Sequence, residues 1–306
     1  MERKVIVIVG PTCSGKTELS LLLAEELNTE IISADSRQFY KYLDIGTAKP
    51  DVDSLKKIKH HFINSLNPGE YYNASKFEKD ALEVCENLFK QNKFPIIVGG
   101  SGLYIKALID GIFDSADIDT DYRKIILNQK ELYGNEYIYN ELKKVDPVSA
   151  SKMLPQNWKR VLRALEVYHQ TGEPIWKQQQ KHKREQEMNF YQYGLSWERK
   201  KLYANIENRV DKMISDGLIE EVKDILNTGY DSKLNSLNTV GYNEIISYLN
   251  EEITLERAVE LIKRNTRRYA KRQLTWFKGD ERIKWFEVEN KEKLKGISKK
   301  ILEDIT

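Results

Sequence analysis

The sequence predicts an α/β fold in which a P-loop NTPase-like core, built on a parallel β-sheet, carries a helical insertion domain. A short β-branched run at residues 4–9 leads into a glycine-punctuated loop, and two further apolar runs of strand length follow. Stretches with apolar residues at helical spacing alternate with these runs. Strands that alternate with helices are typical of a mostly parallel sheet with both faces covered.

Each expected strand of the core ends beside a small or polar residue. The strands are expected at residues 4–9, 31–34 and 95–98, and the helices at 18–27 and 103–108. Gly10, Asp35 and Ser101 lie just past these three strands. Ligands of such sheets collect beyond the carboxyl ends of the strands, so we expect the three residues to converge on one crevice.

The middle of the chain has a different pattern of residue types. Between residues 114 and 190 the β-branched runs give way to polar helical stretches, and residues 158–169 carry one apolar stripe. We therefore predict a core domain formed by residues 1–113 and 191–306, with a helical insertion domain over 114–190. The stretch 177–188 is nearly free of apolar residues, which indicates a solvated helix or a linker.

The last third of the chain, from 197 to about 286, is expected to be helical again. The expected helix stops or turns are Gly217, Gly229 and Gly241. A helix over 255–277 has basic residues off its apolar stripe, and these are Lys263, Arg264, Arg267, Arg268, Lys271 and Arg272. Two interpretations stay open for this face, namely phosphate contact or solvated salt bridges. Trp276 and Phe277 are expected in the core.

Composition limits the class of protein. The chain has 306 residues, 40% of them hydrophobic, and a net charge of +2, so a polyanion would have to meet a local basic patch. No apolar run is long enough to span a bilayer and no signal peptide precedes the first strand, so we expect a cytoplasmic protein without a membrane partner. A monomer is also expected. Two cysteines, Cys13 and Cys85, are too few for a disulfide framework.

Residues 10–17, GPTCSGKT, fit the eight-residue P-loop pattern in the strand-then-helix context that the motif needs. The glycines let backbone N–H groups surround a phosphate, Lys16 supplies a mobile cation, and Thr17 can hold Mg²⁺. The residues expected to contact the phosphates are Gly10, Pro11, Thr12, Cys13, Ser14, Gly15, Lys16 and Thr17. The motif alone does not say which phosphorylated molecule it binds.

Three functions are compatible with this loop. In a nucleotide or small-molecule kinase, or an ATPase, the ligand would be ATP and residues 31–35 would form a Walker B-like strand whose carboxylate supports magnesium. In a transferase, a diphosphate would be the leaving group, and Lys16, Thr17 and magnesium would stabilise the charge that develops on it. A non-catalytic, nucleotide-dependent RNA-binding module is the third.

Six motifs decide between these functions by resemblance. They are GPTCSGKT at 10–17, ADSRQFY at 34–40, LDIGTAKP at 43–50, HHFINSLNP at 60–68, GGSGLYI at 99–105 and RVLRALEVY at 160–168. Together they resemble the motifs of the tRNA dimethylallyltransferases, also called isopentenyltransferases or IPP transferases, in that family's order and over nearly the whole chain. LDIGTAKP soon after DSRQ is specific, because ordinary P-loop kinases do not carry it.

The resemblance implies transfer of a dimethylallyl group from dimethylallyl diphosphate to N6 of adenine 37 in tRNA, with Mg²⁺ as cofactor. By the same resemblance, Asp35 hydrogen-bonds the adenine amine and takes its proton. Lys16 and Thr17 hold the diphosphate and the metal, and Arg209 steadies the departing charge. Ser101 lines the channel between the two substrates.

Contacts with the anticodon stem-loop of tRNA are also implied. The adenine has to leave its stack to reach a buried carboxylate, so base flipping is expected. The residues that the resemblance assigns to tRNA are Asp35, Ser36, Arg37, Gln38, Ser101, Arg123, Gln156, Asn157, Trp158, Lys159 and Arg160. The insertion domain would then close over the anticodon stem.

Two clusters of possible metal ligands are interpreted as structural. His60 and His61 are adjacent in a strand-like segment, and neighbouring residues of a strand face opposite ways, so they do not form a ligand pair. Four aspartates, Asp114, Asp117, Asp119 and Asp121, lack the DDxxD spacing of other prenyltransferases. A solvated acidic linker is the favoured interpretation of these aspartates.

Overall fold

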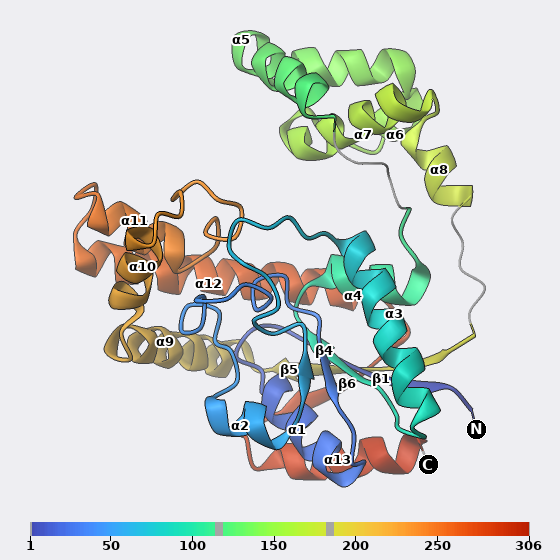
Figure 1. Cartoon of the computed structure of the whole chain (residues 1–306), viewed down its shortest axis with the longest axis vertical. Helices are drawn as coiled ribbons and strands as arrows, with labels where there is room; N and C mark the ends of the chain where they lie inside the picture. Colours follow the sequence, from blue (N-terminus) through green and yellow to red (C-terminus); the bar gives the residue numbers. More distant parts are fainter. Residues whose placement is uncertain (1, 114–118, 182–186, 306) are drawn as a thin grey trace. The chain divides into compact units, whose positions relative to one another are not determined.

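The structure, a computed structural model, describes residues 2–113, 119–181 and 187–305, with the side chains of 179 and 181 excepted (Figure 1). The chain divides into two compact units. The core unit comprises Met1–Ile109 and Gln186–Thr306, and the insertion unit comprises Asp110–Glu185, in the region where the sequence analysis places an insertion domain over 114–190.

A six-stranded parallel sheet forms the centre of the core unit, in the order β3-β2-β4-β1-β5-β6. The strands are β1 (Lys4–Val9), β2 (Ile31–Ser33), β3 (His60–His61), β4 (Ile96–Gly99), β5 (Asn189–Trp197) and β6 (Ile283–Val288). The predicted α/β fold class with a parallel sheet is confirmed. Parallel strands need crossovers, and helices supply most of them here.

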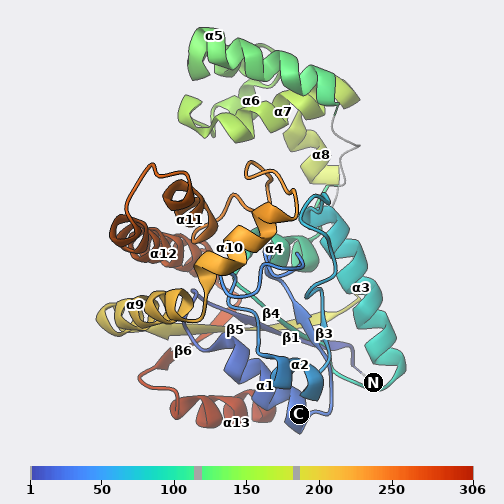
Figure 2. The same ribbon diagram turned by 60° about the vertical axis from the view of Figure 1, so that its left-hand side comes forward.

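Helices cover both faces of this sheet (Figures 1 and 2). The helices of the core unit are α1 (Lys16–Glu26), α2 (Val52–Lys57), α3 (Ala74–Lys90), α4 (Gly102–Asp110), α9 (Arg199–Ser215), α10 (Leu218–Asn227), α11 (Tyr242–Leu249), α12 (Leu255–Lys278) and α13 (Lys293–Ile305). Along β1, Val5 and Val7 face a core with α3, α4 and α12, whereas Ile6 and Ile8 face a core with α1 and α13. This two-residue alternation is the geometry of a strand buried on both faces.

A third apolar cluster joins α9, α10, α11 and α12 to the segment after β2. Leu43 and Tyr40 of that segment pack with Val222 and Ile225 of α10 and with Tyr242. The segment that contains DSRQ and LDIGTAKP is therefore built into the core unit rather than left as a surface loop.

The expected elements near the N-terminus all form, but two strands near the C-terminus do not follow the sequence analysis. Helix was expected from 197 to about 286, and this is wrong for its end, because β6 occupies Ile283–Val288. Strand β5 was not predicted. It pairs with β1 on one side and β6 on the other, and aromatic residues such as Tyr193 supply its buried surface.

The insertion unit is helical. Its elements are α5 (Thr120–Val145), α6 (Pro147–Ala150), a 3₁₀ turn (Pro155–Asn157), α7 (Trp158–Thr171) and α8 (Ile175–Lys181). The stripe expected on 158–169 is buried: Val161, Leu162 and Leu165 pack against Ile138 and Leu142 of α5. This unit therefore has an apolar core of its own.

The two polar clusters have structural roles where they are described. Asp119 caps α5 by accepting hydrogen bonds from the backbone of Asp121 and Tyr122, at 3.0 and 2.9 Å, and Asp114 and Asp117 lie outside the described residues. In β3, His61 Nε2 lies 2.7 Å from a carboxylate oxygen of Glu30. Across the described ranges, no helix combines the length and apolarity that crossing a bilayer requires.

Candidate active site

The loop between β1 and α1 has the geometry of a phosphate cradle. Gly10 has a φ of +147°, and a Cβ there would lie 2.8 Å from the carbonyl oxygen of Leu195 in β5, so only glycine fits. Gly15, with a φ of +92°, lies immediately before α1 and lets the chain turn into the helix. The loop therefore wraps the N-terminal end of α1, where backbone N–H groups and the helix dipole favour an anion.

Side chains from distant elements fix this loop. Gln273 of α12, only 6% exposed, accepts a hydrogen bond from Thr12 N at 2.8 Å and donates to Gly100 O at 3.0 Å. Its amide thus joins the P-loop to the end of β4. The hydroxyl of Ser14 is buried and has no hydrogen-bond partner among the described residues. A buried hydroxyl without a partner is unfavourable unless a ligand supplies one.

Two cations lie at this cradle. Lys16 Nζ donates to Pro11 O at 2.7 Å, and Arg209 of α9 donates to the hydroxyl of Thr12 at 3.3 Å. Burial and then the positive charge of Arg209 lower the pKa of Lys16 to about 8, and the negative charge of Asp35 opposes both effects. Two positive charges held this close favour a ligand with more than one negative charge.

Asp35 lies beyond β2 and next to Ser101. Its carboxylate accepts a hydrogen bond from Arg37 N at 2.9 Å, which fixes the turn that follows the strand. The Ser101 hydroxyl accepts from Ser36 N at 3.0 Å, and Ser101 N donates to Ala34 O at 3.3 Å. The ends of β2 and β4 are therefore joined through Ser101.

The structure thus brings Lys16, Arg209, Asp35 and Ser101 to the same edge of the sheet. For a metal, no group of three or more His, Cys, Asp or Glu side chains gathers anywhere in the described ranges. Thr17 is exposed at the start of α1, so its hydroxyl is accessible to an ion that also binds phosphate oxygens. This donor set fits Mg²⁺, which commonly takes few protein ligands beside a phosphorylated substrate.

Within the core unit, two residues assigned to tRNA are held by the chain itself. Arg37 donates to the carbonyls of Asn235 and Asn238, the latter at 3.3 Å. The Gln38 amide donates to Thr47 O at 3.2 Å. Both side chains shape the loop in this structure, and tRNA contact by them stays a prediction.

Within the insertion unit, the assigned residues divide into two sets. The exposed ones lie at the start of α7 and are Gln156, Asn157, Lys159 and Arg160. Trp158 is half-buried, with Lys130 Nζ 4.7 Å from its ring centroid. Arg123 differs, because its guanidinium lies 2.6 Å from the carboxylate of Glu166, which is 1% exposed. Arg123 therefore has a structural partner that the sequence did not reveal.

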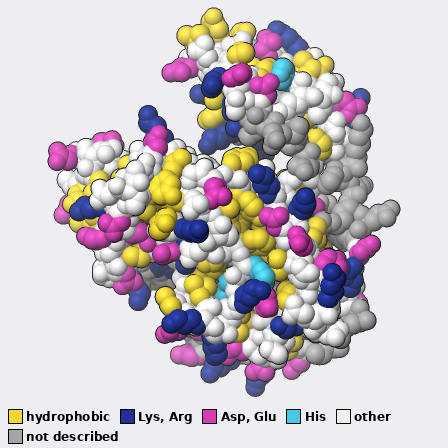
Figure 3. Space-filling view, in the orientation of Figure 1, with side chains coloured by type: hydrophobic (Ala, Val, Ile, Leu, Met, Phe, Trp, Pro, Cys, Tyr) yellow, Lys and Arg dark blue, Asp and Glu magenta, His cyan; other side chains and the backbone are white. Residues whose placement is uncertain are grey.

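The expected basic face of α12 is partly neutralised. Lys263 lies 2.6 Å from Asp211 and Arg267 lies 2.7 Å from Glu207, so both pair with α9. On the face of the core unit drawn in Figure 3, basic and acidic side chains are interspersed. Trp276 was expected in the core, and this is wrong, because it is 43% exposed.

Several residues that build the site were missed from the sequence. Gln273 is one of them. It is a polar residue on the buried stripe of α12, three turns after Ile262, and a buried polar residue on an apolar stripe signals a hydrogen-bond partner. Trp197, which donates to Ser14 O at 3.0 Å, was missed because it belongs to strand β5, which was not predicted. Glu221 of α10, which accepts hydrogen bonds from the backbone of residues 44–46, carried no local signal in the sequence.

Comparison with known proteins agrees with this geometry. The family model described as IPP transferase matches residues 38–280. The chain is 45% identical to a tRNA dimethylallyltransferase of Alkaliphilus oremlandii, covering 99% of this chain and 97% of the relative. It is 43% identical to a tRNA dimethylallyltransferase of Thermodesulfovibrio yellowstonii, covering 98% and 97%. These relatives extend the match over the P-loop and Asp35, which precede the region of the family model.

Solved structures show the same likeness. A tRNA isopentenylpyrophosphate transferase from Bacillus halodurans superposes with a TM-score of 0.72 at 37% identity, covering 99% of this chain and 96% of that one. A eukaryotic dimethylallyltransferase acting on tRNA superposes with a TM-score of 0.81 at 28% identity, covering 99% and 80%. With a family model that matches most of its length and relatives that match nearly all of it, this chain belongs to the IPP transferase family.

Proposed function

We propose that this protein transfers a dimethylallyl group from dimethylallyl diphosphate to N6 of adenine 37 in tRNA and releases diphosphate. The observation that supports this most directly is the combination of two cations and one carboxylate at a single P-loop. Lys16 and Arg209 lie where a diphosphate would bind, and Asp35 lies close enough to Lys16 to affect its pKa. The relatives reported above are named tRNA dimethylallyltransferases, which supports transfer of a dimethylallyl group to tRNA.

The reaction forms a nitrogen–carbon bond, breaks a carbon–oxygen bond and moves one proton. The N6 nitrogen forms a bond to the first carbon of the dimethylallyl group as that carbon separates from the diphosphate oxygen. The bonding electrons leave with the diphosphate, and one N6 proton passes to the Asp35 carboxylate. Because the adenine amine is a weak nucleophile and an allylic carbon tolerates positive charge, leaving-group stabilisation is the largest task.

Different residues of the site would stabilise the leaving group and accept the proton. Lys16 and Arg209 neutralise charge on the diphosphate as it leaves, and Ser14 offers its unpartnered hydroxyl to a phosphate oxygen. Asp35 accepts the proton, a role that contributes about 10²- to 10⁴-fold in enzymes. Bound Mg²⁺ would supply further charge neutralisation to the diphosphate, with Thr17 as the residue that holds it.

Contacts with tRNA would come from both units. We assign the turn 35–38 and Ser101 to the flipped nucleotide, and the exposed start of α7 to the anticodon stem. Lys159 and Arg160 are exposed there and suit phosphate contact. The reaction is assigned to the cytoplasm, where the two buried, free cysteines stay reduced.

The test is a pair of incubations. In the first, the protein receives labelled dimethylallyl diphosphate, magnesium and undermodified tRNA, and we expect label on the adenine at position 37 without ATP consumption. Chelation of magnesium should abolish the transfer and added Mg²⁺ should restore it. In the second, ATP replaces the isoprenoid diphosphate. ATP turnover alone would indicate a kinase or ATPase, and salt-sensitive retention of RNA with neither reaction would indicate a binding module.

A further inference from the structure

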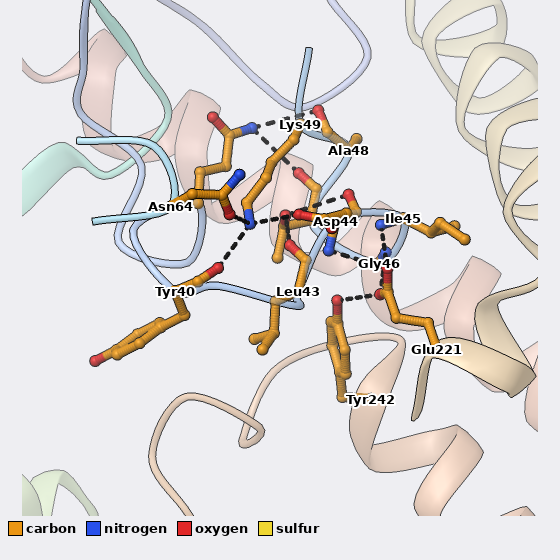
Figure 4. A network of polar contacts seen from close by, with 12 residues as sticks. Tyr40, Leu43, Asp44, Ile45, Gly46, Ala48, Lys49, Asn64, Glu221 and Tyr242 are labelled. Carbon is orange, nitrogen blue, oxygen red and sulfur yellow. Dashed lines mark hydrogen bonds and ion pairs between the residues drawn. The ribbon is translucent and has the colours of Figure 1, made fainter. Parts of the chain in front are cut away.

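One carboxylate receives three consecutive backbone amides of the LDIGTAKP loop. Glu221 of α10 accepts hydrogen bonds from the N–H groups of Asp44, Ile45 and Gly46, at 3.0, 2.6 and 3.1 Å (Figure 4). Successive N–H groups that point to one side form a concave anion site, which here is filled by a side chain of the same protein. Hydrogen bonds to an ionised acceptor are the stronger ones.

Tyr242 packs against the loop and completes this arrangement. Its side chain is fully buried, and its hydroxyl donates to Glu221 at 2.5 Å. Burial raises the pKa of Tyr242, and the neighbouring carboxylate of Glu221 raises it further, so the phenol stays a donor. A Cβ on Gly46 would lie 2.4 Å from the ring of Tyr242, so the loop rests directly on the aromatic ring.

Lys49 holds the far end of the same loop. Its side chain is 3% exposed and donates to Tyr40 O at 2.6 Å, to a carboxylate oxygen of Asp44 at 2.7 Å and to the side-chain oxygen of Asn64. Burial lowers the pKa of Lys49, with Asp44 opposing that effect. All three acceptors converge on one buried ammonium group, which uses each of its three donors.

The loop is connected to the turn that carries the candidate base. The side-chain amide of Gln38 donates to Thr47 O and Ala48 O, at 3.2 and 3.3 Å, and accepts from the hydroxyl of Ser33 at 3.2 Å. Ser33 is the last residue of β2, and Gln38 lies in the turn over residues 36–39 that directly follows Asp35. A continuous set of contacts therefore runs from Glu221 through the loop to this turn.

We infer that Glu221 is a positioning residue for Asp35, acting through the loop 43–49 and Gln38, with Tyr242 as its support. The inference rests on the proposed function only in taking Asp35 as the proton acceptor. Glu221 lies on a helix far along the sequence and contacts the loop through its carboxylate. Small displacements of a reacting group cost rate steeply, about 10²-fold for 1 Å.

The test compares Glu221→Gln with Glu220→Gln, a matched control at the next position of α10, where the side chain is exposed. An amide at 221 keeps the shape but replaces one acceptor with a donor that faces backbone N–H groups. We expect kcat to fall by about 10- to 100-fold for Glu221→Gln, with KM for dimethylallyl diphosphate within twofold of wild type and the control unchanged. A rise in KM alone, or an equal loss in the control, would overturn the inference.

A double-mutant cycle separates positioning from general support of the fold. If Glu221 acts through Asp35, adding Glu221→Gln to Asp35→Asn should change the residual single-turnover rate by less than twofold. Equal losses in both backgrounds would contradict the inference.

Hydrogen exchange gives a readout that does not need activity. We expect faster exchange of the amides of residues 35–49 in Glu221→Gln than in Glu220→Gln, with both variants folded. Unchanged exchange at 35–40 would overturn the positioning role even if the protein transferred no isoprenoid at all. If the amides of 35–49 exchange faster in Glu221→Gln than in the control but the wild type transfers no isoprenoid, the proposed function is contradicted. The connection from Glu221 to the turn would still stand.

Discussion

Raising the pH from 7 to 9 should weaken the binding of dimethylallyl diphosphate, because the Lys16 ammonium that we assign to its diphosphate loses its proton. Burial and Arg209 lower the pKa of Lys16 to about 8, so its charged form exists below that value and is lost above it. About nine-tenths of Lys16 is protonated at pH 7 and about one-tenth at pH 9. If only the protonated form binds, the dissociation constant rises about tenfold, or about 1.4 kcal/mol.

The measurement is a titration of the protein with dimethylallyl diphosphate in the absence of tRNA, so that no transfer occurs. The terminal phosphate, with a second pKa of about 6, stays ionised over this range. Lys16→Arg is the control, since a guanidinium keeps its charge at pH 9 and its affinity should not change with pH. Removal of Arg209 should move the midpoint upward. Equal affinities at pH 7 and 9 for wild type, or the same slope in Lys16→Arg, would refute the reasoning.

Three further outcomes are expected. Asp35→Ala should lower the single-turnover transfer rate by at least about 100-fold and leave the tRNA dissociation constant within about threefold, by filter binding; a near wild-type rate would remove its assigned role. Gly46→Ala should destabilise the core by about 1–3 kcal/mol in urea unfolding, because its Cβ would strike the Tyr242 ring, whereas Gly69→Ala meets no atom within 4 Å and should be neutral. Arg123→Met should destabilise the insertion unit by about 1–3 kcal/mol, since the buried carboxylate of Glu166 loses the nearer of two arginines and keeps Arg163, at 3.4 Å; an unchanged melting curve would contradict this.

The N-terminal part of the fold could be predicted because its signals are local. Strand β1, the P-loop and α1 follow one another within a short stretch, and a glycine pattern marks the turn between strand and helix. Strand β5 could not be predicted in the same way. It pairs with β1 and β6 along its two edges, and Gln192 and Tyr193, whose side chains point to opposite faces of the sheet, are 4% and 1% exposed. A strand with two buried faces lacks the alternation of polar and apolar residues that reveals a strand with one face in solvent.

The residues of the candidate site also divide into those with a local signal in the sequence and those without one. Asp35 and Ser101 could be found because the carboxyl ends of parallel strands meet at one edge, whatever the rest of the chain does. Gln273 and Glu221 could not, since they reach the site from helices that lie 261 and 175 residues away from their partners Thr12 and Gly46. Such contacts depend on how the helices pack, and the spacing of residues in the sequence does not reveal that packing.

The position of β1 in the middle of the sheet has a consequence for synthesis on the ribosome. One of its neighbours, β5, begins about 180 residues after β1 ends. At bacterial or eukaryotic translation speeds of about 5–20 residues per second, the nascent strand waits roughly 10 to 35 seconds for that neighbour. During this interval the edge of β1 that pairs with β5 lacks its partner, so we expect the five apolar residues from Val5 to Val9 to need protection by chaperones against non-native pairing.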